Sequence, residues 1–216
     1  MDKTLISYVD DLIRRYPLLE PSRETICASY TVLENAYANG GKLLVCGNGG
    51  SAADSEHIVG ELMKGFCLPR KLSPALRQAL RETDPEYGGE LATKLQQSLP
   101  AIALTGHNAL STACLNDVDG RLAYAQQVAG YGNAGDVLLG ISTSGNSKNV
   151  LYAAITARAK GLRVIGLTGR SGGALAGYAD ECIRVNEAET YRVQELHLPV
   201  YHCLCLMLEW RFFGQA

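Results

Sequence analysis

The sequence lacks the features that mark several large classes of protein. Its 216 residues carry 20 lysines and arginines against 22 aspartates and glutamates, so there is no basic excess for binding nucleic acid. No apolar run approaches the length of a membrane span, and the start Met1-Asp2-Lys3-Thr4 lacks the apolar core of a signal peptide. We therefore expect a cytoplasmic protein that binds neither nucleic acid nor membranes. Its length suits one domain, 1–216.

Cysteine occurs seven times, but not at the spacing of a metal site. Cys203 and Cys205 form a C-x-C pair within a helical pattern, which is not the spacing of a zinc knuckle. The other cysteines are scattered, mostly within apolar segments. We therefore expect reduced, buried thiols.

Short apolar segments alternate with helical patterns along most of the chain. Strands are expected at 42–46, 101–104, 136–141, 163–167 and 182–185. Helices are expected at 2–15, 22–38, 53–65, within 108–130 in two pieces, at 147–160 and at 191–212. This order predicts an α/β fold with a doubly wound, parallel five-stranded sheet and a helical N-terminal segment, 1–40.

The segment 66–99 departs from this alternation. It contains several prolines, a Gly-Gly pair and many charges, with one helical stretch near 74–82. We interpret it as an insertion that leaves the core and returns, and not as a second domain.

Two loops of small polar residues follow expected strands. Gly47-Asn48-Gly49-Gly50-Ser51 comes after the first strand, and Ser142-Thr143-Ser144-Gly145-Asn146-Ser147 comes after the third. Where a strand leads into a helix, free backbone N–H groups and the positive end of the helix dipole favour a phosphate. Neither loop fits the P-loop or the dinucleotide fingerprint, so the pattern favours a phosphorylated metabolite over a nucleotide.

Two of the four histidines lie near acidic or amide side chains at helical spacing. His57 and Glu61 are four residues apart, so both leave the same face of the expected helix. Such a pair can ligate one metal ion or act as acid and base on one substrate. A solvated pair on a helix surface is the alternative interpretation.

The final helix carries Gln194, His197 and His202. Gln194 and His202 are about 12 Å apart along an ideal helix and turned by roughly 80°, so they reach one ion only if both side chains converge. By spacing alone, His197 is the easier neighbour of Gln194. Either histidine could instead be packed and hydrogen-bonded in the core.

Asn116 and Asp117 follow an expected helix, and His107 follows an expected strand. An amide beside a carboxylate suits hydrogen bonds to sugar hydroxyls, although the same pair is common at helix ends. His107 could line the same rim, but no role is assigned to it.

Taken together, these loops and histidine-bearing helices form a set that resembles the sugar isomerase (SIS) domain family, and within it the phosphoheptose isomerases. The matching stretches are Cys46–Ser51 with His57 and Glu61, Asn116-Asp117, Gly135–Ser147, Leu167–Gly169, and Gln194–His197 with His202. The resemblance covers almost the whole chain apart from Phe66–Leu99 and implies a flavodoxin-like fold. It further implies isomerisation of sedoheptulose 7-phosphate to D-glycero-D-manno-heptose 7-phosphate through an enediol.

The resemblance also implies a role for each matching residue. The phosphate would be held by Ser142, Thr143, Ser144 and Ser147. The rest of the substrate would meet Asn48, Gly49, Gly50, Ser51, Glu61, Asn116, Asp117 and Gln194. A metal ion, commonly zinc, maps onto His57, Glu61, Gln194 and His202, with Glu61 and His202 as base and acid. The resemblance thus favours His202 over His197 and implies a homotetramer with sites at subunit interfaces.

Two relatives of other function remain as alternatives. One is a non-catalytic scaffold of the same family that binds the replication initiator protein, and the other is a sugar-phosphate-sensing module. The complete set of His57, Glu61, Gln194 and His202 favours the enzyme over the scaffold. The long insertion 66–99, together with Tyr191 near Gln194, leaves the identity of the sugar phosphate open.

Overall fold

The computed structural model describes residues 2–214 and contains a five-stranded parallel sheet. Its strands are β1 (Leu43–Cys46), β2 (Ala101–Ala103), β3 (Val137–Ser142), β4 (Arg163–Thr168) and β5 (Glu181–Arg184). Their order is β2-β1-β3-β4-β5, and every neighbouring pair is parallel. This order is the flavodoxin-like arrangement, so the predicted fold class is confirmed.

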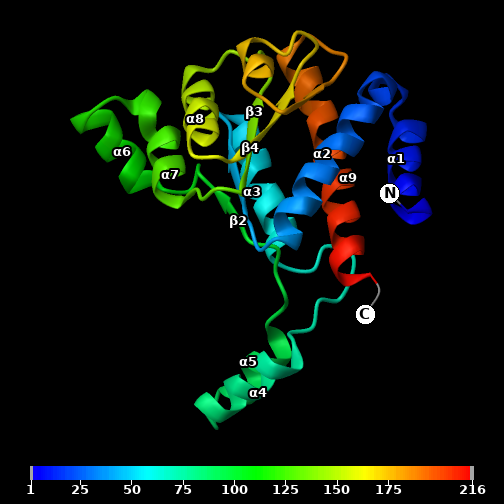
Figure 1. The fold of residues 1–216 in the computed structure, drawn as a ribbon, viewed down its shortest axis with the longest axis vertical. Helices are drawn as coiled ribbons and strands as arrows, with labels where there is room; N and C mark the ends of the chain where they lie inside the picture. The colour runs from blue at the N-terminus through cyan, green and yellow to red at the C-terminus, as the bar shows by residue number, and fades with distance from the viewer. Residues whose placement is uncertain (1, 215–216) are drawn as a thin grey trace.

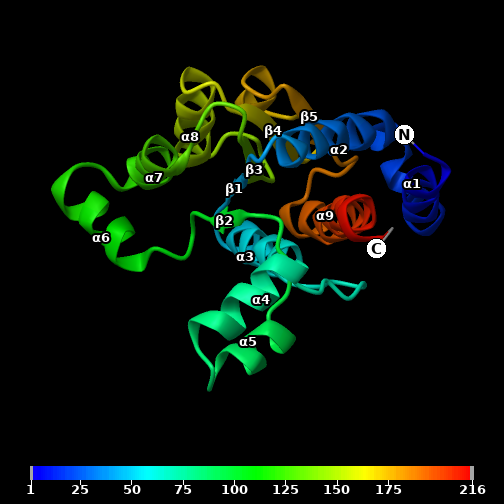
Figure 2. The same cartoon turned by 60° about the horizontal axis from the view of Figure 1, so that its bottom comes forward.

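Helices cover both faces of the sheet (Figure 1). On one face lie α2 (Arg23–Ala38), α3 (Gly50–Met63) and α9 (Thr190–Phe213), with α1 (Lys3–Arg15) packed against α9; the 3₁₀ turn η1 (Pro17–Ser22) joins α1 to α2. On the other face lie α7 (Ala123–Tyr131) and α8 (Lys148–Ala159). The outlying helix α6 (Asn108–Asp117) reaches α7 through η2 (Gly120–Leu122), and η3 (Ala174–Gly177) precedes β5 (Figure 2).

The two central strands are apolar because both of their faces are covered. Every residue of β1 and β3 is buried. Leu43 belongs to the cluster under α2 and α9, whereas Leu44 belongs to the cluster under α8. Continuous apolar strands are therefore a requirement of this layered packing, as the sequence pattern predicted.

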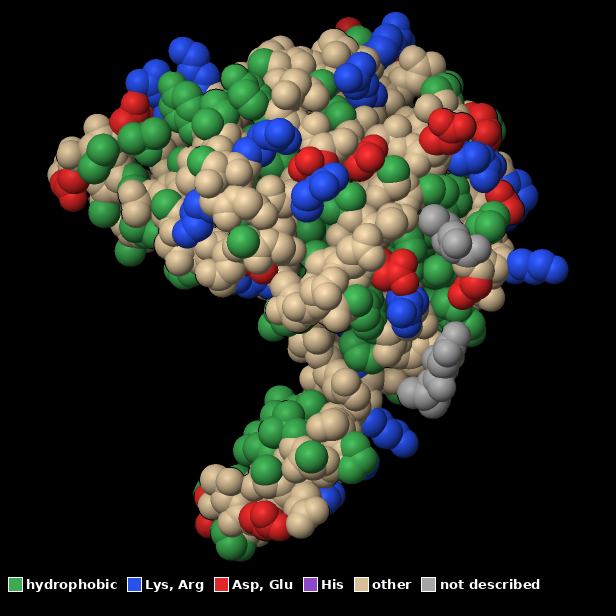
Figure 3. All heavy atoms as spheres, in the orientation of Figure 1, with side chains coloured by type: hydrophobic (Ala, Val, Ile, Leu, Met, Phe, Trp, Pro, Cys, Tyr) green, Lys and Arg blue, Asp and Glu red, His purple; other side chains and the backbone are tan. Residues whose placement is uncertain are grey.

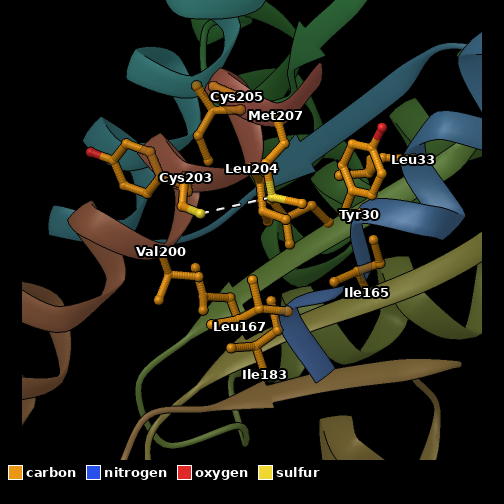
Figure 4. Packing of buried hydrophobic residues seen from close by; sticks show 14 of the residues in the cluster. Tyr30, Leu33, Ile165, Leu167, Ile183, Val200, Cys203, Leu204, Cys205 and Met207 are labelled. Atoms are coloured by element: carbon orange, nitrogen blue, oxygen red, sulfur yellow. Dashed lines mark hydrogen bonds between the residues drawn. The ribbon is translucent and has the colours of Figure 1, made fainter. Parts of the chain in front are cut away.

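The C-terminal helix α9 runs through the larger core. Val200, Leu204 and Met207 of α9 pack with Leu167 and Ile183 of the sheet (Figure 4). Burial of each such side chain contributes about 1.5–3 kcal/mol to folding. This packing fixes which face of α9 points outward and therefore which of its polar side chains can reach a site.

The start of α3 differs from the sequence expectation. It begins at Gly50, three residues before the predicted start at Ala53, so Gly50 and Ser51 belong to its first turn. Gly49 precedes it with a φ of 56°, a conformation that L side chains rarely adopt. Gly49, Gly50 and Ser51 have low helix propensity, which is why the pattern did not reveal this turn.

The insertion forms an arm that projects from the body (Figure 3). It consists of α4 (Pro74–Thr83), close to the predicted helix, and α5 (Gly88–Lys94), which was not predicted. Gly88 lets the two helices approach, because a Cβ there would lie 2.0 Å from the Leu80 carbonyl oxygen. Leu76, Leu91 and Leu95 remain exposed on the arm.

Two further expectations concern membranes and thiols. No helix of the described chain is long and apolar enough to cross a membrane. All seven cysteines are free, and only Cys67 is exposed. The predicted burial therefore holds for Cys46, Cys114, Cys203 and Cys205, and in part for Cys27 and Cys182.

Candidate active site

The two polar loops meet at the carboxyl edge of the sheet. They follow β1 and β3, which are neighbours, and the chain then continues into α3 on one face and α8 on the other. Diverging connections of this kind open a crevice at the strand ends, where α/β proteins commonly bind ligands.

An amide pair joins the two loops. Asn48 donates to the side-chain oxygen of Asn149 at 2.9 Å, and Asn149 donates to that of Asn48 at 2.8 Å. Asn149 lies in the first turn of α8 and was not predicted as a site residue. Its partner is about a hundred positions away in sequence, so no local pattern could have identified it.

The second polar loop, Ser142–Ser147, is a compact turn whose hydroxyl groups lie close together. The hydroxyls of Ser142 and Ser147 lie 3.1 Å apart, and Ser147 is the N-cap of α8. Gly145 has a φ of 69°, and a Cβ there would lie 2.0 Å from the Gly172 carbonyl oxygen. The loop thus gathers Ser142, Thr143, Ser144 and Ser147 at the positive end of α8, an arrangement suited to a phosphate.

Gln194 lies beside the first loop. A Cβ on Gly50 would be 2.5 Å from the Gln194 side-chain nitrogen, so the Gln194 amide lies directly against this glycine. The first turn of α3 therefore lies beside the N-terminal part of α9, and Ser51, next to Gly50, is buried. This placement puts Gln194 with the residues predicted to meet the sugar.

A second cluster lies about two turns further along α3 and α9. His57 Nε2 is 3.2 Å from Glu61 Oε1, and the rings of His57 and His202 have centroids 5.0 Å apart. Glu61 Oε2 and His202 Nε2 are both buried without a hydrogen-bond partner among the described residues. The structure thus brings together three of the four predicted metal and catalytic residues.

Tyr201 and Asp54 form a hydrogen-bonded chain with His57 on the side of its ring away from Glu61. The Tyr201 hydroxyl lies 3.0 Å from His57 Nδ1 and donates to Asp54 Oδ1 at 3.2 Å. Burial raises the pKa of Asp54 and of Tyr201 above their usual values, although the Tyr201 hydrogen bond offsets part of the shift at Asp54. Neither residue was predicted, because neither belongs to a recognisable motif.

The His202 ring is held in its neutral form. Burial lowers its pKa, and the nearby His57 lowers it further. The Phe66 ring packs against it at a centroid distance of 5.4 Å. At neutral pH this imidazole can therefore donate one hydrogen bond and accept another.

The imidazole nitrogens and carboxylate oxygens of this cluster are atoms of the kind that bind zinc. Two ligands of a tetrahedral zinc ion lie about 3.3 Å apart, close to the observed separation of His57 Nε2 and Glu61 Oε1. Within residues 2–214, however, no three His, Cys, Asp or Glu side chains are arranged to hold an ion. Gln194 lies beside Gly50, and an ideal helix places it about 12 Å along α9 from His202.

The remaining candidates lie apart from this cluster. Asn116 and Asp117 are exposed at the end of α6, where the Asn116 amide donates to Asp117 Oδ1 at 2.7 Å. His107 precedes α6, with its ring 5.6 Å from that of Tyr131. His197 is fully buried, and neither of its ring nitrogens has a hydrogen-bond partner among the described residues.

Known proteins resemble this chain along most of its length. The model of the SIS domain matches residues 7–84 and 79–169. The phosphoheptose isomerase of Geotalea daltonii is 41% identical over 190 residues, covering 88% of this chain and 85% of that protein. The phosphoheptose isomerase of Thiobacillus denitrificans is 42% identical over 177 residues, covering 81% and 77%.

Solved structures agree with these relatives. The phosphoheptose isomerase GmhA from Neisseria gonorrhoeae superposes with a TM-score of 0.73 at 31% identity, covering 96% of this chain and 97% of that chain. The fold, the two polar loops and the match to the SIS domain model together define the class of protein. The chain belongs to the SIS domain family. Within that family it falls in the phosphoheptose isomerase group and is a phosphosugar isomerase.

Proposed function

We propose that the protein converts sedoheptulose 7-phosphate to D-glycero-D-manno-heptose 7-phosphate. The observation that carries this proposal is the cluster of His57 and Glu61 on α3, which begins at the first polar loop, with His202 on α9, whose Gln194 lies beside that loop. The named activity of the relatives supports the choice of a seven-carbon substrate.

Substrate binding is assigned to the loops. The hydroxyls of Ser142, Thr143, Ser144 and Ser147 hold the phosphate at the start of α8. Asn48, Gly49, Gly50 and Ser51 meet the sugar, with Gln194 beside Gly50; Asn116 and Asp117 complete this set. Because the phosphate is held away from the reacting carbons, its binding energy can orient them.

Proton transfer is assigned to the helix cluster. Glu61 Oε2 accepts no hydrogen bond within the described chain and has the Lys64 ammonium at 3.8 Å, so it can take the proton from the carbon beside the carbonyl. His202, neutral at pH 7, donates to the carbonyl oxygen as the enediol forms. Glu61 then returns its proton to the neighbouring carbon of the enediol, and His202 takes back a proton from the other hydroxyl, which becomes the new carbonyl.

A zinc ion is proposed for the same cluster, held by His57, Glu61, His202 and Gln194. When bound, it would polarise the substrate carbonyl. Because Gln194 and His202 are about 12 Å apart along an ideal helix, both side chains would have to converge to reach one ion, within one subunit or across two. As the resemblance implies, we also propose a homotetramer with sites at its interfaces, in the cytoplasm.

The experiment is turnover of sedoheptulose 7-phosphate with zinc supplied. Glu61→Gln and His202→Ala should each lower kcat about 100-fold or more while circular dichroism stays unchanged. Glu195→Gln changes an exposed glutamate on α9, the helix that carries His202. It is the matched control and should retain activity. If the wild-type protein isomerises no heptose, hexose or pentose phosphate, the proposal fails.

A further inference from the structure

A buried ion pair lies at the far end of α3, immediately behind the proposed base. Arg70 Nε donates to Glu209 Oε1 at 2.8 Å, and both side chains are almost completely buried. Arg70 belongs to the first residues of the insertion, and Glu209 belongs to the last turns of α9. Burying two charges is costly, so the pair invites a functional explanation.

Glu209 holds the turn that follows α3. Besides the Arg70 side chain, its carboxylate accepts the backbone N–H groups of Phe66 at 2.8 Å, Cys67 at 2.8 Å and Leu68 at 3.0 Å. Four donors thus surround one carboxylate. Charge-assisted bonds of this kind are stronger than neutral ones, so the path of residues 66–68 is closely defined.

Arg70 holds the end of α3 itself. Its two terminal nitrogens donate to the carbonyl oxygens of Leu62 at 2.7 Å and Glu61 at 3.0 Å. These carbonyls belong to the last turn of α3, which a cation stabilises through the helix dipole. One of the two belongs to the proposed base.

The same arrangement reaches the proposed acid. Phe66, whose N–H is bound by Glu209, packs its ring against that of His202. One carboxylate therefore acts on both partners of the proton transfer, on Glu61 through Arg70 and on His202 through Phe66.

We propose that Glu209 and Arg70 are positioning residues that set the relative placement of Glu61 and His202. Neither hydrogen-bonds to the loop Ser142–Ser147, which is predicted to bind the phosphate at the start of α8, or to the loop at the other end of α3. The inference rests on the proposed function, because it assumes that Glu61 and His202 carry the reaction. It predicts a loss confined to the chemical step.

The chain offers a matched control for the cost of disturbing a buried carboxylate. Asp136 lies at the opposite edge of the sheet and accepts the Lys42 N–H at 2.9 Å, the Lys42 ammonium at 2.6 Å and the Asn133 N–H at 2.8 Å. Asp136→Asn removes a similar buried charge without any contact to α3. A merely structural effect should therefore be shared by both variants.

The experiment measures kcat and KM for sedoheptulose 7-phosphate in the full-length, folded protein. Glu209→Gln should lower kcat about tenfold or more and leave KM within about twofold, because displacement by a fraction of an ångström affects proton transfer more than phosphate binding. Asp136→Asn should keep kcat within about twofold of the wild type. Equal kcat in Glu209→Gln and the wild type, or equal losses in both variants, would overturn the inference.

Arg70→Lys keeps the inference testable if Glu209→Gln does not fold. Lysine retains the charge beside Glu209 but cannot reach both carbonyls of α3, so kcat should again fall with little change in KM. An Arg70→Lys protein with wild-type kcat contradicts the proposal. An inactive wild-type protein would instead remove the proposed function, and this inference with it.

Discussion

The Nδ1 atom of His57 and the hydroxyl oxygen of Tyr201 lie 3.0 Å apart, and that hydroxyl donates its proton to Asp54. With the hydroxyl proton donated to Asp54, the Tyr201 oxygen can accept a proton from His57 Nδ1. His57 Nε2, which lies 3.2 Å from Glu61 Oε1, would then be left to bind a metal ion. This is the tautomer in which an imidazole binds a metal ion through Nε2.

Tyr201→Phe should weaken zinc binding because the outer partner that sets this tautomer is lost. Losses of such partners typically cost about 10–100-fold in metal affinity. Competition with a chromophoric chelator measures the affinity directly. Tyr37→Phe removes a comparable hydrogen bond to the Pro100 carbonyl oxygen, away from the cluster, and is the control. Equal zinc affinity in the two variants would show that Tyr201 does not support the metal site.

Stability should decrease as the pH falls below about 6.5. Burial lowers the pKa of His197 to about 4, whereas an unfolded histidine titrates near 6.5. Between these values the unfolded state binds more protons, so the folded state is fully favoured above pH 6.5 and loses stability toward pH 4. The limit of this contribution is about 3 kcal/mol.

Urea unfolding at a series of pH values measures this effect. His197→Leu, which has no titratable group, should flatten the free energy of unfolding between pH 6.5 and 4. His202 contributes in the same direction, because its pKa is also lowered, so some slope should remain. A variant with the full wild-type slope would exclude His197 as its source.

Removal of the arm should leave the body folded. At its base, Lys71 pairs with Gln96, and the Gln97 N–H donates to the Arg70 carbonyl oxygen at 2.8 Å. Replacing residues 72–95 by Asn-Gly would close the Lys71–Gln96 pair with a two-residue turn. We expect a thermal midpoint within a few degrees of the wild type, since α4 and α5 pack chiefly against each other.

Activity and oligomeric state of the same variant are the second measurement. Both should be retained if the arm is separate from the site. A loss of assembly measured by light scattering would contradict this expectation and show that the exposed leucines of the arm contact another subunit.

A feature could be predicted from the sequence when it depends on residues close together in the chain. The strands, the helices and the two polar loops were predicted from local patterns, because a buried parallel strand or a strand-to-helix turn imposes its own residue types. α5 was missed because a seven-residue helix with two glycines carries almost no periodic signal.

The sequence by itself determined the sheet, its helical layers and the residue types that can bind a phosphate and move a proton. Only the tertiary structure decided which of them meet. It turned His197 into the core, placed Gln194 at Gly50 and His202 at His57, and surrounded Glu209 with four donors. These outcomes depend on how α9 packs beside α3, and that packing joins residues more than a hundred positions apart, which no local spacing encodes.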